Sequence, residues 1–248
     1  MKKILAFDLD DTLAVAKSPI SDEMSETLSQ ILRYFDVCVI SGGRFEQFKL
    51  QVIDRLQLDD AQLCRLHLMP TCGTRYYLYK KDNWEQQYAE DLTDEEKSLA
   101  FAALEKAAKE LGYWEAKPAG VIIEDRESQV TYSALGQKAD AEKKYAWDPS
   151  GEKKAAMQRR VAELLPNLEV RAGGTTSVDV TRVGIDKAYG MQKLLAETKL
   201  KKKDILFFGD KLQDGGNDYP IKMLGIDCLE VDKWQDTVRI LQGILHVL

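Results

Sequence analysis

Four polar side chains stand at or just beyond the ends of short apolar runs, a position typical of residues at the ends of buried strands. They are Asp8, Asp10, Ser41 and Asp210. Carboxylates and hydroxyls at such positions can serve as nucleophile, general acid or base, and ligand of a hard metal ion. The chain has only two histidines, and its four cysteines form no C-x-x-C pair. The sequence therefore predicts carboxylate chemistry rather than a zinc site or a disulfide framework.

The elements that must position these residues alternate between strands and helices. Buried strands are predicted at 4–7, 37–40, 66–69 and 205–208. Helical patterns that begin after Ser21 and at Asp186 fall between such strands. This order is typical of a parallel sheet with covering helices, and the carboxyl ends of parallel strands face one crevice. We therefore expect the four polar residues to lie near one another.

A different pattern interrupts this alternation. A capping box formed by Thr93 and Glu96 opens a helix, and strand-like segments with a further helix follow it up to residue 183. The predicted fold class is α/β, with a Rossmann-like core that contains a parallel sheet and an inserted α+β domain. The domains are expected at residues 1–84 and 185–248 for the core, and at 85–184 for the insertion.

Charge and hydropathy exclude several classes of protein. The net charge of −6 disfavours a nucleic-acid binder, which would usually present a dominant basic surface. No window approaches the ~18 uncharged apolar residues that a membrane helix needs. The first residues are charged too early for a signal peptide. We expect a cytoplasmic protein whose partners include neither nucleic acid nor membrane.

The motif Phe7–Leu13 resembles the first motif of the haloacid dehalogenase superfamily of phosphotransferases. Ser41, Lys187 and Gly209–Asp210 resemble its second, third and fourth motifs, in the same order. The resemblance implies that Asp8 is the nucleophile, which forms an aspartyl phosphate. It also implies that Asp10 is the general acid and base, and its place beside other carboxylates leads us to expect a raised pKa.

The same resemblance implies a Mg²⁺ cofactor. Its ligands would be the Asp8 carboxylate, the main-chain carbonyl of Asp10, and Asp210. Lys187 would neutralise charge on Asp8 and on the phosphoryl group that is transferred. Residues expected to contact the substrate in the core are Thr12, Ser41 and Gly42.

The inserted domain narrows the resemblance to the eukaryotic-type phosphomannomutases. The segments that carry it are Ile123–Arg126, Ser133–Gln137, Ser177–Asp179, Phe208–Lys211 and Gly215–Tyr219. The resemblance implies a substrate that is a hexose phosphate, with Arg126 on a phosphate and with Ser177 and Asp179 on sugar hydroxyls. It also implies Asp218 as a further metal ligand, and a homodimer formed between the inserted domains.

Two positions depart from the phosphomannomutase pattern. Gln137 and Lys144 stand where those enzymes place arginines, and both are still expected to contact the substrate. A mutase must hold a bisphosphate intermediate while it reorients, and the loss of bidentate arginines weakens such a grip. Hydrolysis of a sugar phosphate therefore remains an alternative to isomerisation. A non-catalytic sugar-phosphate-binding protein is a remote alternative.

Overall fold

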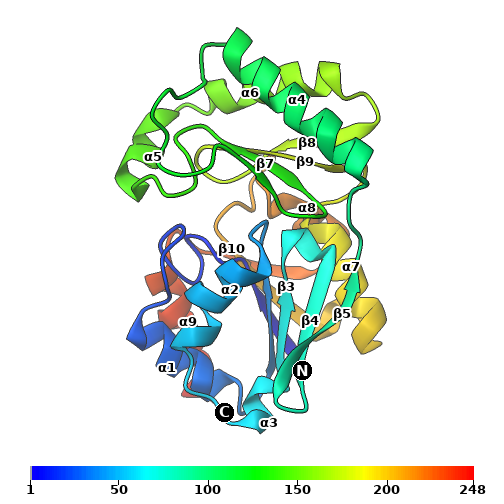
Figure 1. Ribbon diagram of the computed structural model, residues 1–248. Helices are drawn as coiled ribbons and strands as arrows, with labels where there is room; N and C mark the ends of the chain where they lie inside the picture. The colour runs from blue at the N-terminus through cyan, green and yellow to red at the C-terminus, as the bar shows by residue number, and fades with distance from the viewer. Residues whose placement is uncertain (1) are drawn as a thin grey trace. The chain divides into compact units, whose positions relative to one another are not determined.

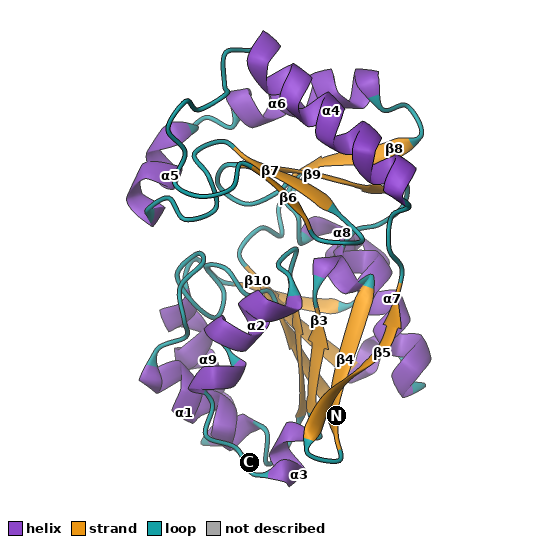
Figure 2. Cartoon of the chain, viewed as in Figure 1, coloured by secondary structure: helices purple, strands orange, loops and turns teal. Residues whose placement is uncertain are grey.

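The computed structural model describes residues 2–248, which divide into two compact units (Figures 1 and 2). Unit 1 comprises residues 1–89 and 186–248, and unit 2 comprises residues 90–185. The first boundary lies after Ala89, later than the expected residue 84. The reason is that strand β5 (Asn83–Ala89) pairs with β4 (Arg75–Lys80) in the sheet of unit 1.

The sheet of unit 1 has seven strands in the order β11-β10-β1-β2-β3-β4-β5. The first five in this order are β11 (Asp227–Glu230), β10 (Ile205–Gly209), β1 (Ile4–Phe7), β2 (Asp36–Ile40) and β3 (Leu66–Met69). The four pairings among these five strands are parallel, whereas β4 pairs antiparallel with both β3 and β5. The predicted α/β class with a mostly parallel sheet is thereby confirmed.

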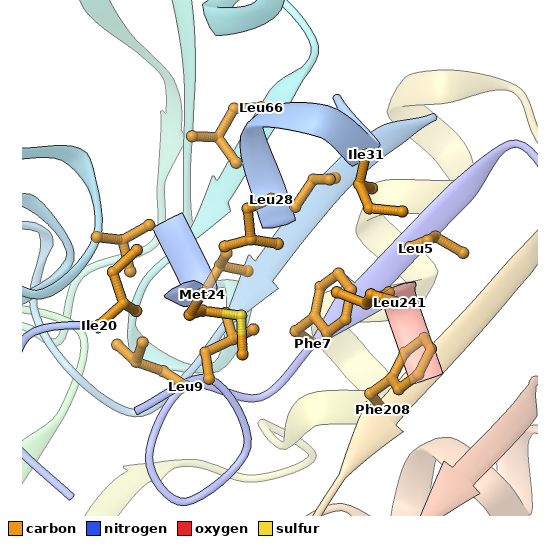
Figure 3. Packing of buried hydrophobic residues seen from close by; sticks show 14 of the residues in the cluster. Leu5, Phe7, Leu9, Ile20, Met24, Leu28, Ile31, Leu66, Phe208 and Leu241 are labelled. Carbon is orange, nitrogen blue, oxygen red and sulfur yellow. The ribbon is translucent and has the colours of Figure 1, made fainter. Parts of the chain in front are cut away.

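Helices cover both faces of this sheet because alternate strand residues point to opposite sides. Leu5 and Phe7 of β1 pack with Met24 of α1 (Asp22–Ile31) and Leu241 of α9 (Trp234–Leu245) in one core, seen in Figure 3. Ile4 and Ala6 face the other core, which contains side chains of α7 (Lys187–Thr198) and α8 (Tyr219–Leu224). The remaining helices of unit 1 are α2 (Phe45–Gln51) and α3 (Asp60–Leu63).

The helix boundaries follow from local capping. The Ser21 hydroxyl accepts the Met24 amide at 3.2 Å at the start of α1. Thr93 and Glu96 form the predicted capping box at the start of α4 (Asp94–Glu110). Each such cap satisfies amides that a helix leaves unpaired, and is typically worth about 1 kcal/mol.

Unit 2 is an antiparallel sheet in the order β6-β7-β9-β8, with helices on one face. Its strands are β6 (Ile123–Asp125), β7 (Val130–Ser133), β9 (Ser177–Arg182) and β8 (Leu168–Ala172). Apolar strand residues such as Tyr132 and Val178 pack against α4 and α6 (Glu152–Leu164). The alternate residues are polar and form the opposite face. The short helix α5 (Ala141–Trp147) was not predicted from the sequence.

Within residues 2–248, no helix combines the length and the apolar character needed to cross a membrane.

Candidate active site

Three neighbouring parallel strands bring the predicted core residues to one edge of the sheet. Phe7 is in register with Phe208 of β10 and with Val39 of β2. Asp8 therefore leaves β1 beside the end of β10, where Asp210 follows, and beside the end of β2, where Ser41 follows. The Asp8 amide extends the pairing by donating to the Phe208 carbonyl at 3.0 Å.

Lys187 lies between two buried carboxylates. It is the first residue of α7, whose N-cap Asp186 accepts the Tyr189 amide at 2.9 Å. The Lys187 Nζ lies 2.6 Å from Asp8 Oδ1 and 2.6 Å from Asp218 Oδ1. The side chains of all three residues are almost fully removed from solvent. Burial lowers the pKa of Lys187, but the two carboxylates more than reverse this, so the lysine is held as an ammonium.

Asp8, Asp210 and Asp218 form an acidic cluster. One carboxylate oxygen from each lies within 4.8 Å of the other two. Burial, supported by the charges of Asp218 and Asp210, raises the pKa of Asp8 to about 8 despite the ammonium of Lys187. Burial also raises the pKa of Asp210. Both shifts mean that burial disfavours the ionised form of these carboxyls where no further positive charge is present.

A hard divalent cation fits this cluster. All three donors are carboxylate oxygens, the ligand type that Mg²⁺ prefers. Asp210 Oδ2 pairs with Lys211 Nζ at 2.8 Å, whereas the buried Oδ1 has no hydrogen-bond partner within residues 2–248. A buried carboxylate oxygen without a partner is costly, and a cation would satisfy it.

The loop that carries Asp218 is closed by reciprocal bonds and by two glycines. The Lys211 amide donates to Asp218 Oδ2 at 3.2 Å, and the Asp218 amide donates to the Lys211 carbonyl at 3.2 Å. A Cβ on Gly209 would lie 2.5 Å from Asp218 Oδ2, and one on Gly216 would lie 2.1 Å from the Lys211 carbonyl oxygen. The glycines are therefore needed for the close approach that places Asp218 next to Lys187.

The Asp10 carboxylate is held apart from the acidic cluster by its own partners. Lys17 Nζ lies 2.8 Å from Asp10 Oδ2, and the Lys17 amide donates to Oδ1 at 2.9 Å. Gln51 Nε2 also donates to Oδ1, at 3.3 Å. Burial raises the pKa of Asp10, but Lys17 and Gln51 outweigh it and lower the pKa to about 2. The expectation of a raised pKa is wrong, because Lys17 rather than another carboxylate is the neighbour that dominates.

The other predicted core residues lie in tight main-chain turns. Ser41 is buried, its hydroxyl accepts the Gly43 amide at 3.4 Å, and its carbonyl accepts the Cys72 amide at 3.0 Å. Gly42 lies inside this turn. Thr12 is fully buried, and its carbonyl accepts the Thr237 hydroxyl at 2.7 Å. The roles of these residues toward a substrate remain predictions.

In unit 2, three predicted residues share the polar face of the sheet. Asp179 stands opposite Thr131 in the pairing of β7 with β9, and Thr131 Oγ1 donates to Asp179 Oδ1 at 2.7 Å. Ser177 lies two residues before Asp179 on the same face. Arg126 is buried, and its Nε donates to Glu124 Oε2 at 2.8 Å. The structure thus places these side chains on one face, with Glu124 and Thr131 as partners that the sequence did not reveal.

Lys144 contacts Gln137 through the main chain of that residue. The buried Lys144 Nζ donates to the Gln137 carbonyl at 2.9 Å. The side-chain amide nitrogen of Gln137 is buried and has no partner within the described residues. Lys144 thus has a structural contact that the sequence did not predict, because the contact uses a main-chain oxygen seven residues earlier.

Known proteins resemble the chain over nearly its whole length. A family model described as eukaryotic phosphomannomutase matches residues 24–247. Phosphomannomutases of Saccharomyces cerevisiae and Schizosaccharomyces pombe are 25% and 28% identical to the chain, and cover 98% and 99% of it. These alignments cover 94% and 95% of the two relatives.

Solved structures share the fold at lower sequence identity. An IMP-bound IMP-nucleotidase from Plasmodium falciparum superposes with a TM-score of 0.72 at 17% identity, over 99% of this chain and 68% of its own. A haloacid dehalogenase-like hydrolase from Bacteroides thetaiotaomicron gives a TM-score of 0.65 at 15% identity, over 98% of this chain and 100% of its own. The arrangement of a core and an inserted unit is therefore that of the haloacid dehalogenase fold.

Proposed function

The chain belongs to the eukaryotic phosphomannomutase family, and we propose that it interconverts mannose 1-phosphate and mannose 6-phosphate through a phosphorylated Asp8. The single observation that carries this proposal within the site is the placement of Lys187 at 2.6 Å from Asp8, at the edge of the sheet where Asp210 and Asp218 meet. The family match over residues 24–247 supports the choice of substrate class.

Asp8 is the proposed nucleophile. Its carboxylate would attack the phosphoryl group of a hexose phosphate, and the bond from phosphorus to the sugar oxygen would break. In the second half of the reaction, a sugar hydroxyl would take the phosphoryl group from Asp8. Lys187, held as an ammonium, would bind the equatorial phosphoryl oxygens, where charge develops during both transfers.

Asp10 is proposed to handle the proton in both halves. Its low pKa makes it a carboxylate in the structure, which suits the acceptance of a proton from the attacking hydroxyl. Donation of a proton to the leaving oxygen is the reverse of this step and would require a protonated Asp10. Ser41 and the neighbouring main-chain amides are proposed to donate hydrogen bonds to the phosphoryl group, with Thr12 and Gly42 beside them.

Mg²⁺ is the proposed cofactor. Asp8, Asp210 and the main-chain carbonyl of Asp10 would hold it, with Asp218 as a further candidate ligand. When bound, it supplies positive charge that offsets the repulsion between a phosphate dianion and the buried carboxylates. The close approach of the three carboxyl groups and the buried Asp210 Oδ1 support this assignment.

The polar face of unit 2 is proposed to recognise the sugar and its second phosphate. Ser177 and Asp179 offer oxygen atoms to hexose hydroxyls, and the bond from Thr131 fixes the rotamer of Asp179. Arg126 is proposed to bind the distal phosphate with its planar guanidinium, which the Glu124 carboxylate orients.

Hydrolysis of a sugar phosphate is the second candidate function. The observation that favours it is the contact of Lys144 with the Gln137 carbonyl, because an ammonium used in this way contributes less to a second phosphate site. A hydrolase would turn over hexose phosphate without a bisphosphate activator. The proposed mutase instead depends on a trace of hexose 1,6-bisphosphate, so the dependence of the rate on this activator separates the two functions.

Replacement of Asp8 by asparagine tests the covalent mechanism. We expect Asp8→Asn to abolish Mg²⁺-dependent turnover of mannose 1-phosphate, because the amide is a poor nucleophile of nearly the same shape. The exposed Asp22→Asn serves as a matched control and should retain wild-type turnover. Unchanged turnover in Asp8→Asn would refute the mechanism. A wild-type protein that binds hexose phosphate without turnover would favour the non-catalytic alternative.

A further inference from the structure

Three hydrogen-bond donors converge on the carboxylate of Asp10. Oδ1 accepts the Lys17 amide at 2.9 Å and the Gln51 side-chain amide at 3.3 Å, while Oδ2 pairs with the Lys17 ammonium at 2.8 Å. A single residue thus binds both oxygens, through its main chain and its side chain. This arrangement fixes the rotation of the carboxylate about its side-chain torsions, because either contact alone would leave one oxygen unrestrained.

The main chain at Lys17 has an unusual conformation that accompanies this double contact. Lys17 has a φ of 61°, in the left-handed region that non-glycine residues rarely adopt. Such conformations cost roughly 1–3 kcal/mol, and they are found where the surrounding structure requires them, often at functional sites. Asp11, at the start of the same loop, also has a positive φ of 66°.

Helix α2 holds this loop in place independently of any substrate. Gln51 is buried in α2, and its side-chain amide donates both to Asp10 and to the Ser18 carbonyl at 2.9 Å. The Gln51 carbonyl accepts the Ile20 amide at 2.8 Å. Gln51 thus forms hydrogen bonds with the main chain of both Ser18 and Ile20. The fold of unit 1 therefore determines the position of Lys17 next to Asp10.

We propose that Lys17 is a positioning residue, which holds the Asp10 carboxylate in the orientation that accepts a proton from the attacking hydroxyl. This inference rests on the proposed function. All three protein groups that contact the carboxylate are donors, so both of its oxygens act as acceptors in this arrangement. Oδ1 already receives two N–H groups, whereas Oδ2 receives only the ammonium among residues 2–248 and retains a lone pair for the substrate. Oδ2 is therefore the oxygen that meets the sugar hydroxyl.

The inference concerns both directions of phosphoryl transfer. Transfer from the sugar oxygen to Asp8 and transfer from Asp8 to that oxygen pass through one transition state in opposite directions, so both use the orientation that Lys17 maintains. Lys17→Met keeps the main-chain amide and the length of the side chain but removes the ammonium. We expect it to slow both transfers by about 10-fold or more, because an oriented general acid or base typically contributes about 10²–10⁴-fold.

The test labels Asp8 with radioactive hexose 1,6-bisphosphate and measures the two transfers separately by rapid acid quench. Uptake of label gives the first transfer, and loss of label to added mannose 1-phosphate gives the second. Lys17→Arg should restore both transfers to within about 3-fold of wild type, because its side chain can pair with the same oxygen. Lys106→Met, which removes an exposed lysine from α4, is the control and should leave both transfers unchanged.

The outcomes distinguish this inference from the proposed function. A loss in Lys17→Met that Lys17→Arg does not restore, or a lower melting temperature that accounts for the loss, would assign Lys17 a merely structural role and refute the inference. No change in either transfer would also refute it. If wild-type protein takes up no label, the proposed function itself fails, and the inference fails with it.

Discussion

Replacement of Lys187 by methionine should destabilise unit 1 strongly, because it leaves two buried carboxylates without their counter-charge. At an effective dielectric constant of about 20, each contact at 2.6 Å corresponds to roughly 6 kcal/mol of Coulomb attraction before desolvation. Desolvation of the three groups offsets much of this. Removal of one partner from a buried ion pair typically costs about 3–5 kcal/mol, which is the loss that we expect in the free energy of unfolding.

The loss should grow as the pH rises. Asp8 has a raised pKa of about 8, so Lys187 faces an ionised Asp8 mainly above this value. Below this pH, Asp8 is mostly protonated and uncharged, so it has less need of the positive charge of Lys187. The difference between wild type and Lys187→Met should therefore be smaller at about pH 6 than at about pH 9. This prediction concerns the protein without added metal.

Urea denaturation followed by circular dichroism measures the effect. Lys222→Met, which removes an exposed lysine from α8, is the control and should change the unfolding free energy by less than about 0.5 kcal/mol. Addition of Asp218→Asn to the Lys187→Met variant should recover at least about 1 kcal/mol, because one of the two uncompensated charges is removed. A Lys187→Met variant as stable as wild type at about pH 9 would refute the idea that Lys187 neutralises the acidic cluster.

Three further predictions test other parts of the structure. Burial lowers the pKa of His67 although the charge of Asp36 opposes this, so its ring resonances in NMR should titrate below the ordinary value of 6.5. Because the unfolded chain binds this proton more readily, the folded protein should lose stability as the pH falls below 6.5. A titration at the ordinary value would contradict the burial of this ring. Gly209→Ala should lower the free energy of unfolding in urea by about 1–3 kcal/mol, since the new Cβ would overlap the Asp218 carboxylate. An unchanged urea concentration at the unfolding midpoint would show that the loop can relax. Thr131→Val should cost about 1–3 kcal/mol in thermal unfolding, because the buried hydroxyl links two polar side chains on the face of unit 2, and an unchanged melting temperature would show that this network is dispensable.

The parallel core could be predicted from the sequence because its signals are local. Apolar runs mark the strands, the Ser21 cap marks the start of α1, and the change from alternating strands and helices indicates an insertion, although its start was predicted at residue 85, inside β5. The meeting of Asp8 with Asp210 follows from the rule that parallel strands end at one edge. The hairpin of β4 and β5 was harder to assign, because only its pairing shows to which unit it belongs.

The contacts that determine charge could not be predicted, because they join residues through irregular backbone or across the fold. The pairing of Lys17 with Asp10 depends on a left-handed residue in a loop and on Gln51 from a distant helix. A lysine seven residues after an aspartate carries no pattern that would indicate this contact. For the same reason the sequence led to the wrong direction for the pKa of Asp10, whereas the structure shows the ammonium that lowers it.

The products formed from mannose 1-phosphate test the central claim most directly. The protein is incubated with this substrate, Mg²⁺ and a trace of hexose 1,6-bisphosphate, and the phosphorus NMR spectrum is followed with time. The proposed function predicts that mannose 6-phosphate is the main product and that little inorganic phosphate accumulates. Inorganic phosphate as the main product would contradict the mutase assignment and would identify the protein as a sugar-phosphate hydrolase of the same fold.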